Sequence, residues 1–291
     1  MDSLEFLDRI KRLTIIAMFS DDDLMERLVL KGGNLLDVVY QVSTRASVDV
    51  DFSIEGEFDD LETLRRRIEN ALRQTFAEAG YVAFDIDIRE VPSPLSDDMR
   101  DFWGGYTIEF KIIERERYAQ LKGDIAALRR LAASVGKRGS TKFNVQISKH
   151  EYCRPKQPEQ LEGYTVYVYS PEMTVGEKLR AICQQMPQYV AAVKSHPSAR
   201  ARDFLDIYTI AEHFAIDFRD GEFQRIVREM FAVKRVPLNL IGEIEGFREY
   251  HRQDFAAVEA TVKPGIQLKD YEFYFNYVVA KCCNLETLWN E

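Results

Sequence analysis

The spacing of apolar residues changes at Pro171. Before this proline, segments that alternate like strands are mixed with segments of helical period, and after it every apolar window has helical spacing. A chain of 291 residues is long enough for two domains of about 150 residues each. The pattern therefore predicts an α+β protein, with a mixed α/β domain at 1–170 followed by an α-helical domain at 171–291.

The expected elements follow from this spacing, from acidic residues at helix starts and from prolines between helices. In the first domain, helices are expected at 4–17, from Asp21 onward, and at 35–43, 59–79 and 116–134. Strands are expected there at 48–54, 81–90, 104–115, 141–148 and 164–169. In the second domain, helices are expected at 172–186, 200–216, 219–232, 244–260 and 268–288.

The charge balance limits the partners of the chain. Asp and Glu number 48 against 39 Lys and Arg, which leaves a formal net charge of −9. Because attraction to phosphate needs positive charge, this surplus argues against a protein that coats nucleic acid, and any nucleic acid would be met locally. The first residues lack the features of a signal peptide, and no apolar run approaches the ~20 residues of a membrane span. These features predict a cytoplasmic protein without a membrane partner.

Cysteine and histidine show no spacing that is typical of a metal site. The four cysteines include no CxxC pair and the four histidines form no HExxH motif, so a zinc site is not expected. The vicinal pair Cys282-Cys283 falls in an apolar helical stretch, where buried thiols are expected.

Asp49 and Asp51 are the first candidates for chemistry. On a strand, residues i and i+2 point to one face about 6.6–7 Å apart, so the two carboxylates would project together. Converging carboxylates repel each other unless a cation neutralises them, and Mg²⁺ takes one or two carboxylates and fills its octahedron with water and substrate phosphate. The alternative is a solvated strand face, which is the interpretation given to Asp85-Ile86-Asp87 at the same spacing.

The surroundings of this pair favour nucleotide binding. Gly32-Gly33 follows an apolar segment and precedes a short expected helix, and such a turn can hold phosphate oxygens with its backbone N–H groups. Ser47 stands two residues before Asp49, and Arg45 two residues earlier still. Glycine turn, hydroxyl, cation and paired carboxylates together provide what a nucleoside triphosphate with Mg²⁺ requires. For Ser47, modification and simple packing are the alternatives to phosphate binding.

The same residues carry a resemblance to a known family. The segments 30–36 (LKGGNLL) and 45–53 (RASVDVDFS) resemble the first motif of AbiEii-type nucleotidyltransferase toxins, which include the MenT enzymes. Segment 172–181 (EMTVGEKLRA) is similar to the family's lysine-containing segment, and 200–208 (RARDFLDIY) to its fourth motif. The pieces keep the family's order over about residues 30–210. The resemblance implies a DNA polymerase β-like nucleotidyltransferase core with a mixed sheet, followed by a helical domain that contributes Lys and Asp to the site.

The resemblance also implies roles for individual residues. The catalytic residues would be Asp49, Asp51, Lys178 and Asp203. Asp49 and Asp51 would be the metal ligands, and the nucleotide contacts would be Gly32, Gly33, Arg45, Ser47 and Lys178. Near the start of a helix, Lys178 would contact the β- and γ-phosphates as a compact positive charge, and a plain surface lysine is the alternative.

The segment around Asp203 leaves one choice open. Asp206 lies on the same helix face as Asp203, and it is interpreted as a packing or ion-pair residue, with Arg202 four residues before it as an intrahelical partner. Arg180, Arg200 and Arg202 make this stretch locally basic, which predicts a positive surface for RNA.

Two positions depart from the family pattern. Asn34 stands where Thr or Ser is common after the glycine pair. Gln146, or alternatively Asn144, occupies the strand position where polymerase β-like enzymes often carry a third acid. An amide cannot accept the proton of the nucleophile as a carboxylate does, so either water or Asp203 does this work or the activity is weak.

The implied function is transfer of an NMP from an NTP to an acceptor hydroxyl, with release of pyrophosphate and with Mg²⁺, or alternatively Mn²⁺, as cofactor. By resemblance the acceptor is a tRNA 3′ end, and the enzyme is the toxin of a type IV-like AbiE/MenT toxin–antitoxin system whose antitoxin is a separate protein. Three alternatives stay open: transfer to a small molecule or a protein, an NTP-binding module without catalysis, and a purely structural protein.

Overall fold

The computed structural model describes residues 3–45, 47–121, 123–135, 139–194, 196–263 and 265–290. Internal contacts divide the chain into two compact units. Unit 1 comprises Met1–Tyr40 and Ser47–Val168, and unit 2 comprises Gln41–Ala46 and Tyr169–Glu291. A short segment of the N-terminal half is therefore grouped with the C-terminal helices. Among the described residues, no helix is both long enough and apolar enough to cross a membrane.

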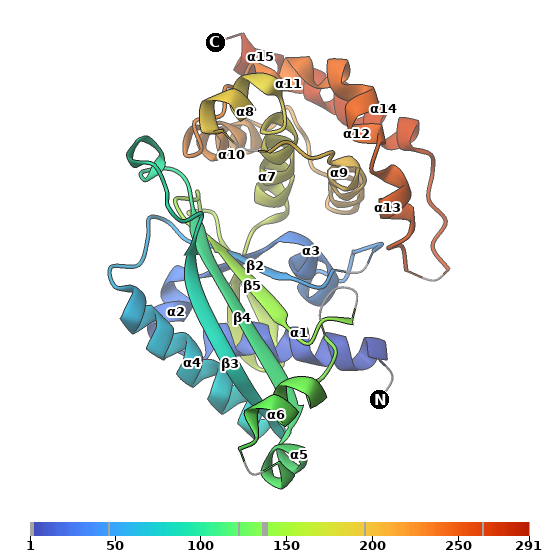
Figure 1. Ribbon diagram of the computed structural model, residues 1–291. Coiled ribbons are helices and arrows are strands. Elements are labelled where there is room, and N and C mark those ends of the chain that lie inside the picture. Colours follow the sequence, from blue (N-terminus) through green and yellow to red (C-terminus); the bar gives the residue numbers. More distant parts are fainter. Residues whose placement is uncertain are drawn as a thin grey trace. The chain divides into compact units, whose positions relative to one another are not determined.

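Unit 1 is built on a mixed sheet, whose described residues form seven strands in the order β3-β4-β5-β2-β1-β7-β6. Figure 1 labels β2, β3, β4 and β5 of this sheet. The strands are β1 (Val29–Lys31), β2 (Val50–Ser53), β3 (Tyr81–Val91), β4 (Gly105–Glu114), β5 (Phe143–Ser148), β6 (Gln157–Leu161) and β7 (Tyr164–Val168). β2 pairs antiparallel with β1 and parallel with β5, so it lies inside the sheet. Both of its edges are therefore hydrogen-bonded, which holds its side chains in fixed positions.

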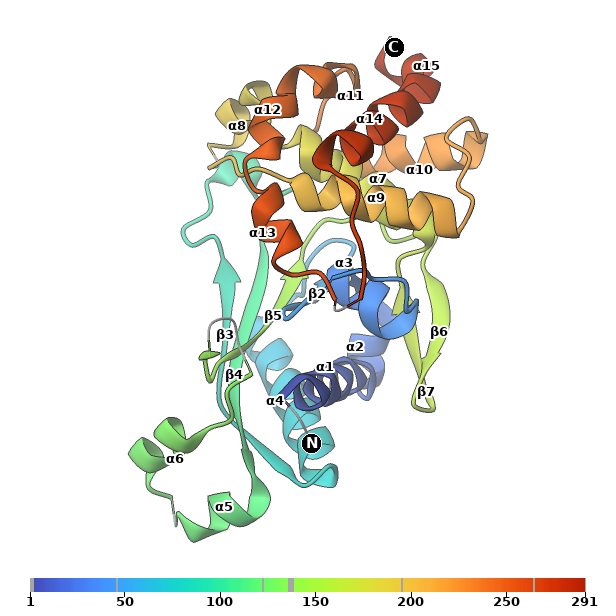
Figure 2. The same cartoon turned by 90° about the vertical axis from the view of Figure 1, so that its right-hand side faces the viewer.

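Alternation along the strands gives this sheet one apolar and one polar face. In β4, buried apolar residues alternate with the partly exposed Thr107, Glu109 and Lys111. The helices α1 (Ser3–Phe19) and α4 (Leu61–Glu78) cover the apolar face (Figure 2), where Phe76 of α4 packs edge-on against Phe110. Burial of each such phenylalanine side chain stabilises the folded state by roughly 1.5–3 kcal/mol. The opposite face of the sheet carries polar and charged side chains such as Glu109 and Lys111.

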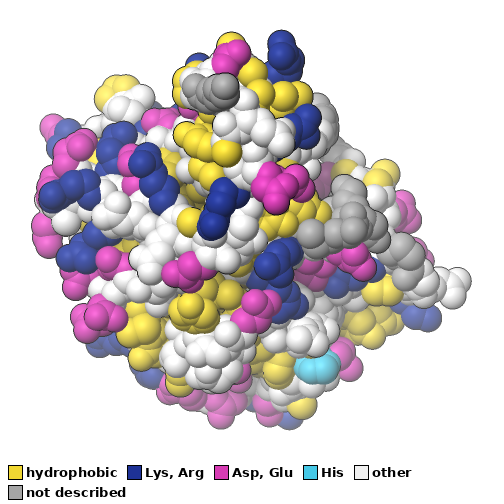
Figure 3. Space-filling view, turned by 90° about the horizontal axis from the view of Figure 1, so that it is seen from below, with side chains coloured by type: hydrophobic (Ala, Val, Ile, Leu, Met, Phe, Trp, Pro, Cys, Tyr) yellow, Lys and Arg dark blue, Asp and Glu magenta, His cyan; other side chains and the backbone are white. Residues whose placement is uncertain are grey.

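Two short helices lie on the opposite side of β3 and β4 from α4 (Figure 2). They are α5 (Arg115–Gln120) and α6 (Ile125–Leu131), where a single helix at 116–134 was expected. That prediction is wrong because the chain turns between them at Gly123, whose φ is +83°. Leu128 of α6 joins a small apolar cluster with Phe84 and Ile113, which fixes α6 to the sheet. Seen from below, basic and acidic side chains are interspersed over the molecule (Figure 3).

The segment after β1 also differs from the expected helix at 35–43. Gly32–Asn34 forms one turn of α-helix (α3), and the chain continues as a π-helical turn, Leu35–Val39. The buried Lys11 of α1 donates to Asp37 in this turn, at 2.8 Å. π-helical turns are rare and occur mostly at functional sites. Lys11 therefore holds an unusual turn directly behind the glycine pair.

Other elements of unit 1 agree with the expectation to within a few residues, including α2 (Asp22–Arg27), which Asp21 caps. β2 is shorter than the strand expected at 48–54. β1 and β6 were missed for different reasons. All three residues of β1 are buried, so it shows no alternation, and β6 contains Pro158 and mostly exposed residues.

Unit 2 is helical. Its helices are α7 (Pro171–Cys183), α8 (Pro187–Val193), α9 (Ala201–His213), α10 (Gly221–Ala232), α11 (Leu240–Glu243), α12 (Arg248–Arg252), α13 (Phe255–Glu259), α14 (Tyr271–Cys282) and α15 (Glu286–Trp289). The side chain of Ser170 caps α7, and Pro171 occupies its first turn, where a missing N–H has no cost. α7 packs against α9 and α10, and Phe204 of α9 stacks on Phe275 of α14 with ring centroids 5.0 Å apart.

Two long helices predicted for this unit are interrupted. The segment 244–260 contains a 3₁₀ turn (Ile244–Phe247), α12 and α13, and the segment 268–288 is divided between α14 and α15. The apolar period continues across these breaks, so spacing alone could not locate them. Of the vicinal cysteines, Cys282 is buried, and burial raises the pKa of its thiol, but Cys283 is exposed, so the expectation of two buried thiols was half wrong.

Candidate functional site

Asp51 lies on the polar face of the sheet in unit 1. Its neighbours in β2, Val50 and Phe52, are fully buried, whereas Asp51 is partly exposed. The register places Asp51 opposite Lys31 of β1 and opposite Gln146 of β5. Directly paired residues project to the same face of a sheet. The amide of Gln146 is therefore the cross-strand neighbour of the Asp51 carboxylate.

Gly32 lies against this carboxylate. Its φ of +73° is a backbone conformation that strains any residue with a Cβ atom. A Cβ atom added there would lie 2.8 Å from Oδ2 of Asp51. Glycine is thus required at this position both by the conformation of the turn and by the space that the carboxylate leaves.

Asn34 connects the same turn to Asp49. Asn34 is fully buried, and its Nδ2 donates to the backbone carbonyl oxygen of Asp49 at 2.6 Å. The residue that departs from the family pattern therefore fixes the backbone just before β2. A Ser or Thr hydroxyl is shorter and carries no second donor, so it would not reproduce this contact unchanged.

Asp49 and Ser47 both precede β2, which begins at Val50. Both are partly exposed and lie outside β2, so the strand geometry expected for the pair Asp49 and Asp51 does not extend to Asp49. Among the described residues, no group of three or more His, Cys, Asp or Glu is arranged to hold a metal ion. A carboxylate pair nevertheless fits Mg²⁺, which commonly takes one or two carboxylates and completes its shell with water and substrate phosphates.

A buried ion pair beside Asp51 escaped the sequence analysis. Lys31 and Glu151 are 7% and 4% exposed, and Nζ of Lys31 lies 3.6 Å from Oε1 of Glu151. The backbone N–H of Glu151 donates to Ile54, which follows β2. The only sequence signals were that Lys31 precedes the glycine pair and that Glu151 follows an expected strand. Neither signal indicates that the two residues meet.

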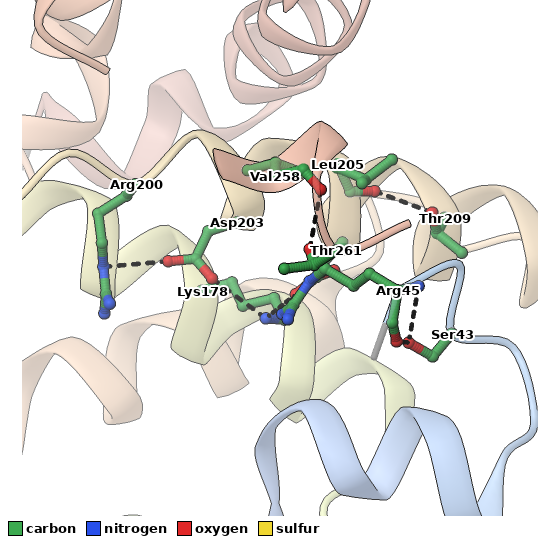
Figure 4. Close-up of polar contacts among 10 residues, drawn as sticks. Ser43, Arg45, Lys178, Arg200, Asp203, Leu205, Thr209, Val258 and Thr261 are labelled. Atoms are coloured by element: carbon green, nitrogen blue, oxygen red, sulfur yellow. Dashed lines mark hydrogen bonds and ion pairs between the residues drawn. The ribbon is translucent and has the colours of Figure 1, made fainter. Parts of the chain in front are cut away.

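The predicted site residues of unit 2 form a separate cluster. Lys178 lies in the middle of α7 and is 4% exposed, so it is neither near a helix start nor a surface lysine. Its Nζ donates to Oδ1 of Asp203 at 3.1 Å and to Oδ2 of Asp206 at 2.6 Å, both on α9 (Figure 4). The structure therefore joins Lys178 to both aspartates of the fourth motif.

Arg45 and Arg200 complete this cluster (Figure 4). Arg45 donates to Asp206 from Nε and from a terminal nitrogen, at 3.1 and 2.7 Å, and Nε of Arg200 lies 3.1 Å from Oδ2 of Asp203. Asp206 is thus paired with Lys178 and Arg45, in place of the expected intrahelical pair with Arg202. Arg45, expected beside Asp49, belongs to unit 2 with the cluster. The cluster holds three cations and two carboxylates.

The ion pairs set the protonation states of this cluster. Burial alone would raise the pKa of both carboxyls, but Arg200 and Lys178 hold that of Asp203 well below its usual range, and Arg45 and Lys178 lower that of Asp206. Burial lowers the pKa of Lys178, and the two aspartates more than offset this effect and raise it. A carboxylate with so low a pKa is a weak base, which disfavours Asp203 as the acceptor of the nucleophile's proton.

The basic stretch from Lys178 to Arg202 is not a basic surface. Lys178 and Arg180 are buried, and Arg180 donates to the carbonyl oxygen of Met230 inside the helical packing. Of the three arginines, Arg202 is exposed and Arg200 is turned toward Asp203, and Lys194 is a further exposed cation of this stretch. The prediction of a positive surface here is therefore wrong, because most of these cations serve the interior of unit 2.

Known proteins are similar to this chain. The sequence model described as nucleotidyl transferase AbiEii toxin, type IV toxin–antitoxin system, matches residues 14–277. Among solved structures, JHP933 from Helicobacter pylori has a TM-score of 0.50 at 15% identity, over 100% of this chain and 95% of that one. A second H. pylori protein, provisionally named a nucleotidyltransferase, has a TM-score of 0.50 at 16% identity, over 100% and 98%. No curated protein matches in sequence.

These likenesses bear on fold and family in different ways. At 15% and 16% identity, the solved structures support the fold alone, and they confirm the predicted α+β fold. The family match runs through the glycine turn, both carboxylates of the first motif and the lysine and aspartates of unit 2. The chain therefore belongs to the AbiEii family of nucleotidyltransferase toxins of type IV toxin–antitoxin systems.

Proposed function

We propose that this nucleotidyltransferase moves an NMP from an NTP to an acceptor hydroxyl in an Mg²⁺-dependent reaction. The observation that carries the proposal is the close approach of Gly32 to Oδ2 of Asp51, in a turn that also holds Asp49 through Asn34. It supports the proposal because backbone N–H groups of a glycine turn suit phosphate and a carboxylate such as that of Asp51 suits Mg²⁺. A triphosphate and its metal ion need both groups together.

In this proposal each part of unit 1 has a distinct task. Asp49 and Asp51 hold Mg²⁺, with Mn²⁺ as the alternative, and the bound ion supplies stabilisation of negative charge on the phosphate oxygens. The turn at Gly32-Gly33 binds the triphosphate, with Ser47 as a further contact. Gln146 offers no carboxylate beside Asp51, and Asp203 is a weak base, so the proton of the nucleophile passes to water.

Lys178, Asp203 and Arg45 keep their predicted roles through the family resemblance. Lys178 stays protonated, because the carboxylates beside it raise its pKa. Three cations against two carboxylates leave one positive charge in the cluster, which favours a bound anion such as a nucleotide phosphate. Asp203 orients Lys178 through their hydrogen bond.

The acceptor and the partner are inferred from the family. A toxin of a type IV toxin–antitoxin system has an antitoxin, and we propose a separate antitoxin protein as the partner of this chain. We propose the 3′ end of a tRNA as the acceptor. Transfer to a small molecule or to a protein side chain is the alternative, because Lys178 and Arg180, two of the cations of the expected basic RNA surface, are buried.

The test is transfer of label. The purified protein is incubated with each α-labelled NTP, Mg²⁺ and total cellular RNA, and label is expected in the tRNA band. Asp51→Asn should abolish it, while Asp59→Asn, whose side chain is fully exposed, should not. Label in protein or in small molecules, in place of tRNA, would show that the acceptor belongs to one of those classes. Binding of Mg²⁺–NTP by calorimetry without transfer to any acceptor would contradict catalysis.

A further inference from the structure

A second polar feature of unit 1 lies on the same face of the sheet as Asp51. It is a depression of about 520 Å³ lined by residues of β3, β4 and α6 and by Lys142 before β5. Its charged residues are Asp85, Asp87, Arg89, Glu109, Lys111, Arg129 and Lys142. From the sequence, Asp85-Ile86-Asp87 is expected to be a solvated strand face. The structure makes it part of a pocket with four cations and three carboxylates.

The pocket results from two local irregularities. The pairing of β3 with β4 shifts between Phe84 and Asp87, and Asp85 has a φ of +49°, so the chain bulges there. On the other side, Leu128 packs α6 against the sheet, and this packing brings Arg129 to Asp85, with Nε 2.6 Å from Oδ2. The bulge and the helix together form the walls of the depression.

Two of the three carboxylates, Asp85 and Glu109, are less exposed than most of the cations that they hold, whereas Asp87 is 53% exposed. Asp85 and Glu109 are 23% and 17% exposed, while Arg89, Arg129 and Lys142 are 50%, 56% and 53% exposed. Glu109 accepts from Arg89 at 3.0 Å and from Lys142 at 2.6 Å. Arg129 lowers the pKa of Asp85, and Lys142 lowers that of Glu109, so both carboxylates stay ionised and hold the cations in place.

The exposed cations retain hydrogen-bond donors for a ligand. Arg89 and Arg129 each donate two of the five N–H groups of a guanidinium within the pocket, and Lys142 donates one of three. Forked donors of this kind suit phosphate oxygens. Among the described residues that line the pocket, none is aromatic and only Ile86 is apolar. The pocket therefore offers contacts to a phosphate backbone and no surface for stacking a base.

The register connects this pocket to the candidate metal ligand. Arg89 pairs with Thr107, Thr107 with Gln146, and Gln146 with Asp51, so the four side chains project to one face. Three strand spacings separate Arg89 from Asp51, which is roughly 14 Å. A stacked strand advances about 3.4 Å per nucleotide, so this distance corresponds to about four nucleotides.

We propose that this pocket binds the phosphodiester backbone of a polynucleotide acceptor, a few nucleotides before the hydroxyl that is extended. The inference rests on the proposed function and adds a second binding site, at which the polynucleotide acceptor is held through its backbone. It also supplies local positive contacts that the buried cations Lys178 and Arg180 do not provide. Because the contacts are to phosphates, binding is largely independent of base sequence.

The test uses the full chain and a short fluorescein-labelled single-stranded RNA, with binding followed by anisotropy at several salt concentrations. The double variant Arg129→Gln/Lys142→Gln is expected to bind roughly 10- to 30-fold more weakly near 0.1 M salt, because each lost phosphate contact lowers the salt slope by about 0.7. The matched control is Arg130→Gln, an exposed arginine next to Arg129 that does not line the pocket.

The outcomes separate this inference from the proposed function. Weaker binding and a raised KM for the RNA acceptor in the double variant, with Arg130→Gln like wild type, support the pocket. Equal binding in all three proteins overturns it, even if the wild type transfers label to RNA. If the double variant loses only binding of inorganic pyrophosphate, or of a glutamate-rich peptide, the pocket serves a free anion or a protein and the inference fails. If the double variant binds RNA more weakly but neither wild type nor variants transfer label, the pocket inference is supported and the proposed function is contradicted.

Discussion

Gly32 shows how one residue without a side chain joins two parts of the site. The turn that would bind phosphate and the carboxylate that would bind the metal ion lie so close together that a Cβ atom on Gly32 would clash with Asp51. The glycine pair and the Asp49-Val50-Asp51 pattern could be recognised from the sequence, because glycine at a turn and carboxylates two apart are local signals. That Gly32 touches Asp51 could not, because the contact depends on the register of β1 and β2.

Gly32→Ala is expected to reduce both stability and transfer activity. A Cβ atom would meet Oδ2 of Asp51, so the carboxylate or the turn must move. The matched control is Gly56→Ala, which has a φ of +68° but nothing within 4 Å, so it suffers only the backbone strain of about 1–2 kcal/mol. Denaturant unfolding and Mg²⁺–NTP binding would be measured for both variants. Equal NTP affinity in the two variants would show that the contact with Asp51 does not matter.

His251 is expected to make the stability of the fold depend on pH. It is fully buried, its Nδ1 accepts the backbone N–H of Arg200, and burial lowers its pKa to about 4. The unfolded chain binds this proton near pH 6.5, so stability is lost as the pH falls from 6.5 toward 4, by up to about 3 kcal/mol.

The variant His251→Gln keeps an acceptor for the N–H of Arg200 and removes the titration. Its unfolding free energy should therefore vary less between pH 6.5 and 4 than that of wild type. His213→Gln, at an exposed position of α9, is the control and should keep the wild-type slope. Parallel curves for wild type and His251→Gln would refute the assignment.

At the scale of elements, the sequence was most informative where apolar spacing, caps and turns agreed. α1, α4, α7 and α9 fall close to their expected places, and Asp60 and Ser170 cap α4 and α7 as their residue types suggest. The π-helical turn at Leu35–Val39 had no such signal, because its support from Lys11 comes from another helix. The interrupted helices of unit 2 kept an apolar period across their breaks.

Removing the cation from the buried ion pairs between α7 and α9 should lower the free energy of unfolding. Lys178→Met leaves Asp203 and Asp206 buried without their shared cation, and we expect a loss of about 3–5 kcal/mol in unfolding free energy. Lys194→Met, at an exposed position, should change stability by less than about 0.5 kcal/mol. Activity of the first variant is therefore compared at a temperature where circular dichroism shows it folded. A loss no larger than in the control would mean that solvent reaches the cluster.

At the scale of the whole molecule, the net charge of −9 argues against general coating of nucleic acid, but it does not indicate where the surface is positive. The fold class could be predicted because the change of pattern at Pro171 persists over long windows. The positive regions could not, because burial decides whether an arginine contributes charge to the surface or donates hydrogen bonds inside the protein. Arg180 and Arg129 differ in just this way.

Binding of Mg²⁺–NTP is expected to stabilise the protein. At a ligand concentration about 100 times Kd, the folded state gains about 2.7 kcal/mol, and amide hydrogen exchange should slow around Gly32 and β2 in unit 1. Asp51→Asn should remove this effect, and so should excess EDTA. Equal stabilisation by NTP with and without the divalent ion would contradict a role for Asp49 and Asp51 as metal ligands.

The segment Gln41–Ala46, which is grouped with unit 2, affects how the protein is made. Arg45 leaves the ribosome 161 residues before Asp206, the carboxylate that it neutralises. At about 5–20 residues per second, that interval lasts roughly 8–30 seconds. Unit 2 therefore includes a segment that is synthesised long before its helices. During synthesis this segment must stay accessible until α9 has been made and Arg45 can pair with Asp206.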